Sequence, residues 1–166
     1  GRRAHPPKSE KILWGKINEK ERRKSIRSAI SATILTEVVA GRGHIIPNDY
    51  PFILEDEFES LGKTKSALES FKKLGLEHEL ARAGEKKVRA GKGKSRGRKY
   101  KKRKGPLIVV SKKGKLSKAV ANIPGIDVVE VKNLNTELLA PGGKAGRLTL
   151  WTRAAINILE KENLFK

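Results

Sequence analysis

Residues Leu107–Val110 have the sequence LIVV, an apolar tetrapeptide that follows Pro106. A strand that is apolar at every position is typical of the interior of a parallel sheet, because helices cover both of its faces. Phe52–Leu54, Ile126–Val131 and Leu148–Trp151 are further segments rich in apolar residues, although the second contains two carboxylates and the third a threonine. We therefore expect these four segments to form a mostly parallel central sheet.

A first helix is predicted to begin at Glu19, with Asn18 as its cap and Glu21 in the spacing of a capping box. Gly41 supplies its C-terminal stop. The spacing of its apolar residues indicates one continuous buried face. That face comprises Ile26, Ile30, Thr33, Ile34 and Val38.

Further helices are predicted between and after the strands. Lys63–Leu74 has a helical apolar face and ends before Gly75, and Leu76–Ala83 adds a short helical turn. A short helix includes Leu116–Val120, and Thr152 caps a closing helix. Strands that alternate with helices predict an α/β fold, namely a three-layer sandwich with helices on both faces of the sheet.

The segment Lys86–Lys104, KKVRAGKGKSRGRKYKKRK, holds 12 of the 38 basic residues of the chain and no carboxylate. Its charge of +12 leaves +8 for the rest of the chain, whose total is +20. Val88, Ala90 and Tyr100 are its only apolar side chains, so it cannot bury enough surface to fold on its own. We expect a basic insertion at residues 86–105 that is mobile until a polyanion neutralises it.

Residues 1–18 are predicted to form an extended basic arm. Pro6 and Pro7 disfavour a helix, and Arg and Lys residues are spread along the segment. Trp14 has two possible roles: it docks on the core together with Ile12, or it stacks on a base. Docking is the prediction that we prefer.

Composition narrows the classes of function. Cysteine is absent, which excludes disulfides and cysteine-based zinc sites. No apolar run approaches the roughly 20 residues that span a bilayer, and the basic insertion lacks the large apolar residues of a membrane-bound amphipathic helix. The net charge of +20 therefore indicates a nucleic-acid partner rather than a membrane. We also expect no small-molecule substrate, no cofactor and no homo-oligomer.

Candidate nucleotide-binding motifs fail on spacing. GKT at residues 62–64 and GKS at residues 93–95 match the end of a phosphate-binding loop, but the required earlier glycine is replaced by Glu57 and Val88. A nucleotide-binding, RNA-modifying enzyme needs a glycine-rich turn directly after a strand, and only Ser111–Gly114 approaches that pattern. A chromosomal DNA-binding protein is the other alternative, although no helix-turn-helix or dimerisation heptad is visible.

Catalytic and metal-binding patterns are also lacking. His5, His44 and His78 lie far apart in the sequence, and we expect surface or capping roles for them. The acidic run at residues 55–59 is expected to be a solvated turn, including Asp56, Glu57 and Glu59. Since no nucleophile–base pairing is supported, we predict that the protein is not an enzyme and holds no metal.

Five segments resemble, in the same order, one known family. They are GRRAHPPK from Gly1, ERRKSIRSAISAT from Glu21, RAGKGKSRGRKYKKRKGPLIVV from Arg89, NIPGIDVVEVKNLNTELLAPGG from Asn122 and GRLTLWTRAAI from Gly146. The family is ribosomal protein L four of the large subunit, in its archaeal form. The resemblance covers essentially the whole chain.

The resemblance implies a three-layer α/β domain with a long internal loop that reaches the wall of the polypeptide exit tunnel. In that family GRRAHPPK belongs to the returning limb of the loop, so residues 1–18 are expected to be this limb and residues 19–166 the single domain. The first strand and the outgoing limb and tip of the loop would then be missing. The implied function is that of a structural component of the cytoplasmic ribosome.

Large-subunit rRNA is the partner that we expect, with neighbouring ribosomal proteins beside it. Arginine bridges phosphates bidentately, lysine acts as a point charge, and Tyr100 can stack on an unpaired base. The predicted rRNA-binding residues lie in the arm, in the first turns of the first helix and in the basic insertion. They are Arg2, Arg3, His5, Lys8, Arg22, Arg23, Arg27, Lys87, Arg89, Lys92, Lys94, Arg96, Arg98, Lys99, Tyr100, Lys101, Lys102, Arg103 and Lys104.

Overall fold

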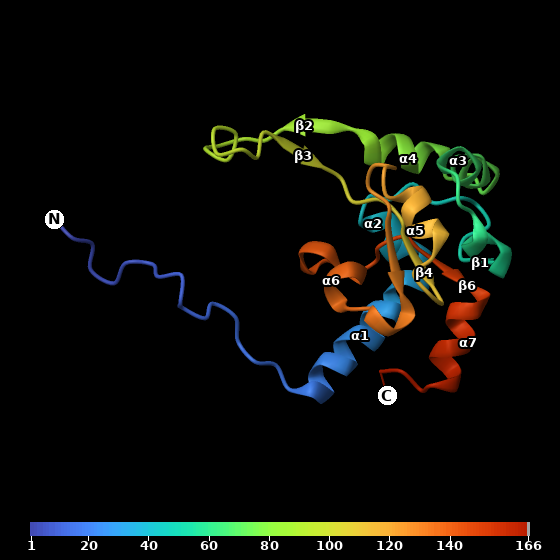
Figure 1. Ribbon diagram of the computed structural model, residues 1–166, viewed down its shortest axis with the longest axis horizontal. Coiled ribbons are helices and arrows are strands. Elements are labelled where there is room, and N and C mark those ends of the chain that lie inside the picture. Colours follow the sequence, from blue (N-terminus) through green and yellow to red (C-terminus); the bar gives the residue numbers. More distant parts are fainter. Residues whose placement is uncertain (166) are drawn as a thin grey trace.

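A four-stranded parallel sheet in the order β1-β6-β4-β5 forms the centre of the structure, a computed structural model that describes residues 1–165 (Figure 1). Its strands are β1 (Ile53–Leu54), β4 (Leu107–Val110), β5 (Asp127–Glu130) and β6 (Thr149–Thr152). The pairings of β1 with β6, β6 with β4 and β4 with β5 are all parallel. The predicted parallel sheet is confirmed, with strand boundaries that differ from the prediction by at most one residue.

Helices cover both faces of this sheet. Successive side chains of β4 point to opposite faces, so that Leu107 and Val109 belong to one buried core and Ile108 and Val110 to another. The core of Ile108 and Val110 is closed by α3 (Thr64–Lys73) and α5 (Lys115–Val120), and the other core by α1 (Glu19–Ile34), α6 (Thr136–Leu139) and α7 (Arg153–Lys161). The predicted three-layer α/β fold is therefore confirmed.

The first predicted helix is in fact two helices. α1 ends at Ile34 and α2 (Thr36–Gly41) follows, because Leu35 between them has extended dihedrals of φ −78° and ψ 106°. The break interrupts the helical stripe, so Ile34 is 54% exposed and Val38 37% exposed, contrary to the prediction that both are buried. Gly41 ends α2 as expected.

Two predicted helix caps have different outcomes. The Asn18 side chain accepts no hydrogen bond, and only its carbonyl oxygen accepts from Arg22 N, so the predicted capping box is wrong. Thr152 Oγ1 does accept from Ala155 N at 3.3 Å at the start of α7. The third helix, α3, ends before Gly75, and α4 (Glu77–Gly84) follows it, as expected.

The basic insertion forms a β-hairpin. β2 (Lys86–Val88) pairs antiparallel with β3 (Tyr100–Lys102), and Arg89 N donates to Lys99 O at 2.8 Å beyond the strands. Gly91 and Gly97 take positive φ values of 81° and 78° in the connecting turns. Within the folded chain the backbone of this segment is paired, and the expectation that it cannot fold on its own stays a prediction. Its mobility stays a prediction, since isolated two-stranded hairpins are marginally stable.

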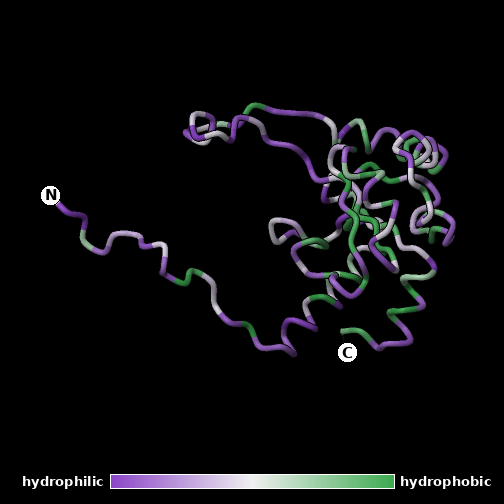
Figure 2. Tube along the Cα trace, viewed as in Figure 1, coloured by the Kyte–Doolittle hydropathy of each residue, from purple (hydrophilic) through white to green (hydrophobic). Residues whose placement is uncertain are grey.

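The hairpin and the basic arm both leave the domain and extend toward the same side of the view (Figure 1). Hydrophilic residues predominate along the hairpin (Figure 2). Within the arm, Ile12 is 73% exposed and Trp14 is 68% exposed, so the predicted docking of Trp14 on the core is wrong. The arm leaves the start of α1 pointing away from both cores, which puts Trp14 out of their reach (Figure 1).

Candidate nucleic-acid interface

The end of the hairpin is attached to the edge of the sheet at which the strands begin. Arg147, fully buried, donates from Nε to Gly105 O at 2.9 Å, from Nη1 to Leu138 O at 3.0 Å and from Nη2 to Asp127 Oδ2 at 2.6 Å. Lys104 Nζ reaches the same oxygen of Asp127 at 2.9 Å. One carboxylate thus joins β5, the loop before β6 and the last residues of the basic insertion.

Acidification should weaken this attachment. Burial opposes ionisation of Asp127, but hydrogen bonds from Lys104 and Arg147 outweigh it and hold the pKa of this carboxyl below its ordinary value. A lowered pKa in the folded state means that the stabilisation is present above the unfolded-state pKa of about 3.9 and is lost as pH falls through the folded-state value. We expect Asp127→Asn to lower the free energy of unfolding at neutral pH and much less at strongly acidic pH.

Urea unfolding at a series of pH values measures this difference. Asp49→Asn removes an exposed carboxyl and serves as the control, whose effect should be small at every pH. If Asp127→Asn destabilises the protein equally at acidic and neutral pH, the pKa of the Asp127 carboxyl is not lowered in the folded state.

The same end of the hairpin is also held by a buried group around Glu79 in α4. The Glu79 carboxylate, fully buried, accepts from Arg82 Nε at 2.7 Å and from Ile45 N at 2.9 Å, and it lies 2.7 Å from His44 Nδ1. Burial raises its pKa, but these partners overcome that effect and lower it overall. Arg82 Nη2 also donates to Lys104 O at 2.9 Å, which ties α4 to the returning strand of the hairpin.

His44 was expected at the surface or in a capping role, and that prediction is wrong because its ring is buried against Glu79. His5 and His78 are exposed. The sequence carried no signal for this pair, since His44 and Glu79 are 35 positions apart. The same is true of Arg147 and Asp127, which sequence reasoning also missed and which are 20 positions apart.

The predicted rRNA-binding residues of the insertion divide into supporting and projecting groups. Arg89, partly buried, donates from Nε to Arg98 O at 3.0 Å and braces the turn. Arg103 lies 3.5 Å from Glu85, and Lys104 is bound to Asp127. Exposed side chains make up the rest, and the Lys99 ammonium lies 5.6 Å from the centre of the Tyr100 ring. The projecting members are Lys87, Lys92, Lys94, Arg96, Arg98, Lys99, Tyr100, Lys101 and Lys102.

The remaining predicted residues lie on two other elements. Arg2, Arg3, His5 and Lys8 are exposed along the arm. Exposed cations also occupy the first turns of α1, namely Arg22, Arg23 and Arg27, with Arg23 held 2.5 Å from Glu19. The structure therefore distributes the predicted residues over arm, helix and hairpin and does not gather them in one compact site.

A nucleotide site would lie at the other edge of the sheet, where the strands end. In α/β proteins nucleotides bind at the carboxyl ends of the strands, between neighbours whose following helices cover opposite faces. Here that position lies between β4 and β6, which α5 and α7 follow on opposite faces. Glu59 fills it, accepting from Ser111 N at 2.8 Å and from Thr152 Oγ1 at 2.5 Å. A carboxylate in this position repels phosphate, which argues against nucleotide binding.

The acidic run at residues 55–59 is therefore not simply a solvated turn. It forms the 3₁₀ helix η1 (Asp56–Ser60), from which Glu59 bridges β4 and β6. Asp56 Oδ1 accepts from Ala154 N at 2.7 Å in the first turn of α7. Glu57 is exposed, as expected. Sequence reasoning missed the bonds of Asp56 and Glu59 because their partners lie more than 50 positions away.

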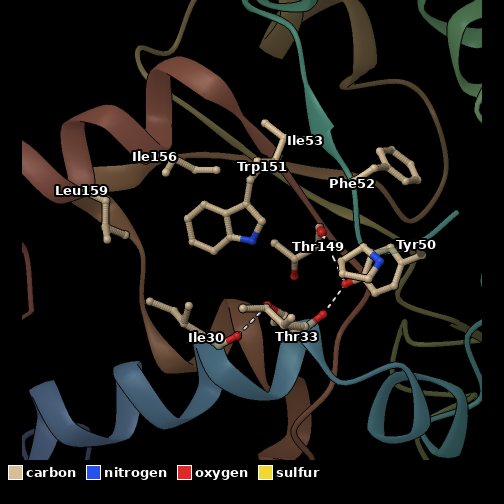
Figure 3. A pocket seen from close by; sticks show the side chains of 11 residues that line it. Ile30, Thr33, Tyr50, Phe52, Ile53, Thr149, Trp151, Ile156 and Leu159 are labelled. Carbon is tan, nitrogen blue, oxygen red and sulfur yellow. Dashed lines mark hydrogen bonds between the residues drawn. The ribbon is translucent and has the colours of Figure 1, made fainter.

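An apolar pocket of about 360 Å³ opens beside β1, between α1 and α7 (Figure 3). Trp151, Ile30 and Leu159 line its interior, and Tyr50 donates from its hydroxyl to Thr33 O at the rim. Burial raises the pKa of Tyr50. The described lining contains no charged side chain, so this pocket offers nothing that would hold a phosphate.

No helix within residues 1–165 has the length and apolar character to cross a membrane. Over the same residues, no three His, Cys, Asp or Glu side chains come together as candidate metal ligands.

Comparison with known proteins shows similarity to one family over almost the whole of this chain. The ribosomal protein L4/L1 family matches residues 1–162. The large ribosomal subunit protein uL4 of Nanoarchaeum equitans is 54% identical over 166 residues, covering 99% of this chain and 62% of that protein. The uL4 proteins of Methanocaldococcus jannaschii and Methanococcoides burtonii are each 52% identical, covering 97% and 96% of this chain and 65% and 64% of theirs.

The chain thus spans less than two thirds of the length of these relatives, but almost all of its own residues take part in the match. The resemblance of its segments, the three-layer fold and the identity to archaeal relatives all agree. The chain belongs to the ribosomal protein L4/L1 family, in its archaeal form.

Proposed function

We propose that the chain is a structural, non-catalytic constituent of the large ribosomal subunit in the cytoplasm, where it binds large-subunit rRNA. The observation that carries the proposal is the basic hairpin, which projects from the domain with twelve cations and no carboxylate between Lys86 and Lys104. The relatives are named as large-subunit proteins. Because the chain spans 62 to 65% of their length, the role of the whole protein is part of the proposal.

The hairpin suits insertion between RNA helices. Its strand residues are exposed, so a narrow ribbon offers cations to phosphates in several directions. Arginines bridge phosphates bidentately and lysines act as point charges, while the half-exposed ring of Tyr100 is available to stack on a base. Such contacts recognise shape and phosphate position more than sequence.

The basic arm is the second rRNA anchor in this proposal. It carries exposed cations, and the exposed Trp14 is available for base stacking, the second of the two roles considered for it. We infer that residues 1–18 are the returning limb of a loop near the polypeptide exit tunnel, and that residues 19–166 are one domain. Neighbouring large-subunit proteins are further partners.

Different observations argue against the two alternative functions, an RNA-modifying enzyme and a chromosomal DNA-binding protein. A nucleotide-binding RNA-modifying enzyme would have to place phosphates where Glu59 bridges β4 and β6. A chromosomal DNA-binding protein shares the positive charge, but the sequence of this chain shows no helix-turn-helix and no dimerisation heptad. RNA binding at the hairpin and the arm requires neither a nucleotide site nor a helix-turn-helix.

A competition experiment tests the proposal. We expect the chain to bind deproteinised archaeal large-subunit rRNA at least about 10-fold more tightly than random-sequence duplex DNA of equal phosphate content, because hairpin and arm fit folded RNA rather than a uniform helix. Filter binding at two salt concentrations measures both affinities. Equal affinities for the two nucleic acids would favour the chromosomal DNA-binding alternative and overturn the proposal.

A further inference from the structure

A basic cleft of about 470 Å³ lies between the base of the hairpin and the loop that precedes β6. Eight of its lining residues are Lys or Arg, whereas Glu85 is its only carboxylate. Three of these cations already have a carboxylate partner: Arg82 with Glu79, Arg103 with Glu85 and Lys104 with Asp127. The cleft therefore presents a strong excess of uncompensated positive charge on the domain itself.

Arg42, just after α2, is the member that points most clearly to a ligand. Its Nη2 donates to Pro141 O at 2.7 Å, but its Nη1 is buried and has no hydrogen-bond partner among the described residues. Burial lowers the pKa of Arg42, and the nearby Arg147 and Arg82 lower it further. Those two arginines each have a carboxylate, Asp127 and Glu79, whereas no carboxylate of residues 1–165 pairs with Arg42. A buried donor without a partner is costly, so the fold must hold Arg42 in place by other means.

The fold does so through the glycine-containing loop PGGKAGR at residues 141–147. Gly146 has a φ of 85°, and a Cβ built on it would lie 2.7 Å from Val38 O in α2. This close approach joins the loop to the helix whose end carries Arg42, while Lys144 of the same loop lines the cleft. Arg42 and Lys144 therefore line one cleft from two segments that are in close contact at Gly146 and Val38.

We propose that this cleft binds a phosphodiester group of RNA, with Arg42 and Lys144 on one side and Lys102 of the hairpin on the other. The inference rests on the proposed rRNA-binding function and adds a contact on the domain, apart from the arm and the tip of the hairpin.

Phosphate is favoured over the carboxylate of a partner protein for two reasons. The cleft continues directly into the cationic strands of the hairpin through Lys87, Lys101 and Lys102, so an RNA backbone that follows the hairpin reaches Arg42 without interruption. A guanidinium and several ammonium groups around one cleft also exceed what a single carboxylate can neutralise, whereas a polynucleotide supplies one charge at every residue.

The test compares Arg42→Gln and Lys144→Gln with Arg153→Gln. Arg153 is an exposed arginine at the start of α7, at the opposite edge of the sheet, and serves as the matched control. We expect each cleft variant to weaken binding of deproteinised large-subunit rRNA by about 10-fold or more. We also expect each to reduce the slope of log affinity against log salt by about 1. Arg153→Gln should change neither quantity.

Thermal unfolding of the free protein separates binding from structure. We expect Arg42→Gln to leave the unfolding temperature almost unchanged, because Arg42 is only partly buried and its Nη1 has no hydrogen-bond partner among the described residues to lose. Lys144 is exposed, so its substitution should not affect folding and keeps the test valid if Arg42→Gln fails to fold.

Three outcomes would overturn the inference. If the unaltered chain binds rRNA and both cleft variants match Arg153→Gln, the cleft assignment fails while the proposed function stands. If the unaltered chain does not bind rRNA, both fail. If a polyglutamate peptide requires Arg42 and rRNA does not, the cleft belongs to an acidic protein partner.

Discussion

Replacing Arg96, Arg98, Lys99, Lys101 and Lys102 with glutamine is expected to weaken binding of large-subunit rRNA by about 10³-fold near physiological salt. All five side chains are exposed on the hairpin, and no carboxylate of the described chain pairs with them. At about 1 kcal/mol for each lost phosphate contact, five contacts give about 5 kcal/mol, which corresponds to more than three powers of ten in affinity. The salt dependence should become correspondingly shallower.

The same substitutions should leave the thermal unfolding of the domain almost unchanged. The hairpin shares no residue with either buried core, and its strands are held by backbone hydrogen bonds that glutamine preserves. Filter binding across a salt series and calorimetry of the free protein measure the two quantities.

The control removes the same number of charges from other surfaces. Glutamine at Lys65, Lys73, Lys112, Lys118 and Arg153 changes five exposed cations outside the arm, α1 and the hairpin. Affinity should then fall far less. If both sets weaken binding equally, only the net charge matters, and the hairpin is not the anchor.

Glu79→Ala is expected to destabilise the folded chain by about 3–5 kcal/mol. The substitution leaves Arg82 and His44 without their buried carboxylate and leaves Ile45 N without an acceptor. For a chain of this size, such a loss lowers the unfolding temperature by roughly 6–20 °C. Because Arg82 also donates to Lys104 O, the substitution should also weaken the attachment of the hairpin base to α4.

Glu77→Ala is the matched control in the same helix. Glu77 is exposed and lies 3.2 Å from Lys72, so its loss should change stability by no more than about 0.5 kcal/mol. Urea unfolding of the two variants measures the contrast directly. Similar destabilisation by both would mean that the buried group around Glu79 contributes no more than a surface ion pair.

The sheet was predictable from local patterns. Leu107–Val110 is apolar at every position because helices cover both of its faces, and that pattern is visible in the sequence without knowledge of any contact. Thr152 as a helix cap follows from the side chain alone, since it bonds to a backbone group three positions later. Both predictions depend on neighbours in sequence.

Predictions failed where the path of the backbone determines which residues are buried or paired. Leu35 divides one apparent helix into two, which periodicity alone does not reveal. Trp14 is apolar enough to dock, yet the direction of the arm keeps it exposed. The backbone pairing of the charged insertion was not predicted, because composition reports side-chain burial and not the hydrogen bonds that form its hairpin.

By itself the sequence determined that this chain has an α/β fold with a cationic insertion, and its motifs identified the family, because apolar periodicity and charge are properties of the residues themselves. Only the tertiary structure decided which charges support the fold and which face outward. Lys104 and Arg103 form ion pairs with Asp127 and Glu85. Glu59 occupies the edge of the sheet at which a nucleotide would bind, and Arg42 Nη1 is buried without a hydrogen-bond partner among the described residues. The reason is physical: the free energy of a charge depends on burial and on partners that folding brings from distant positions.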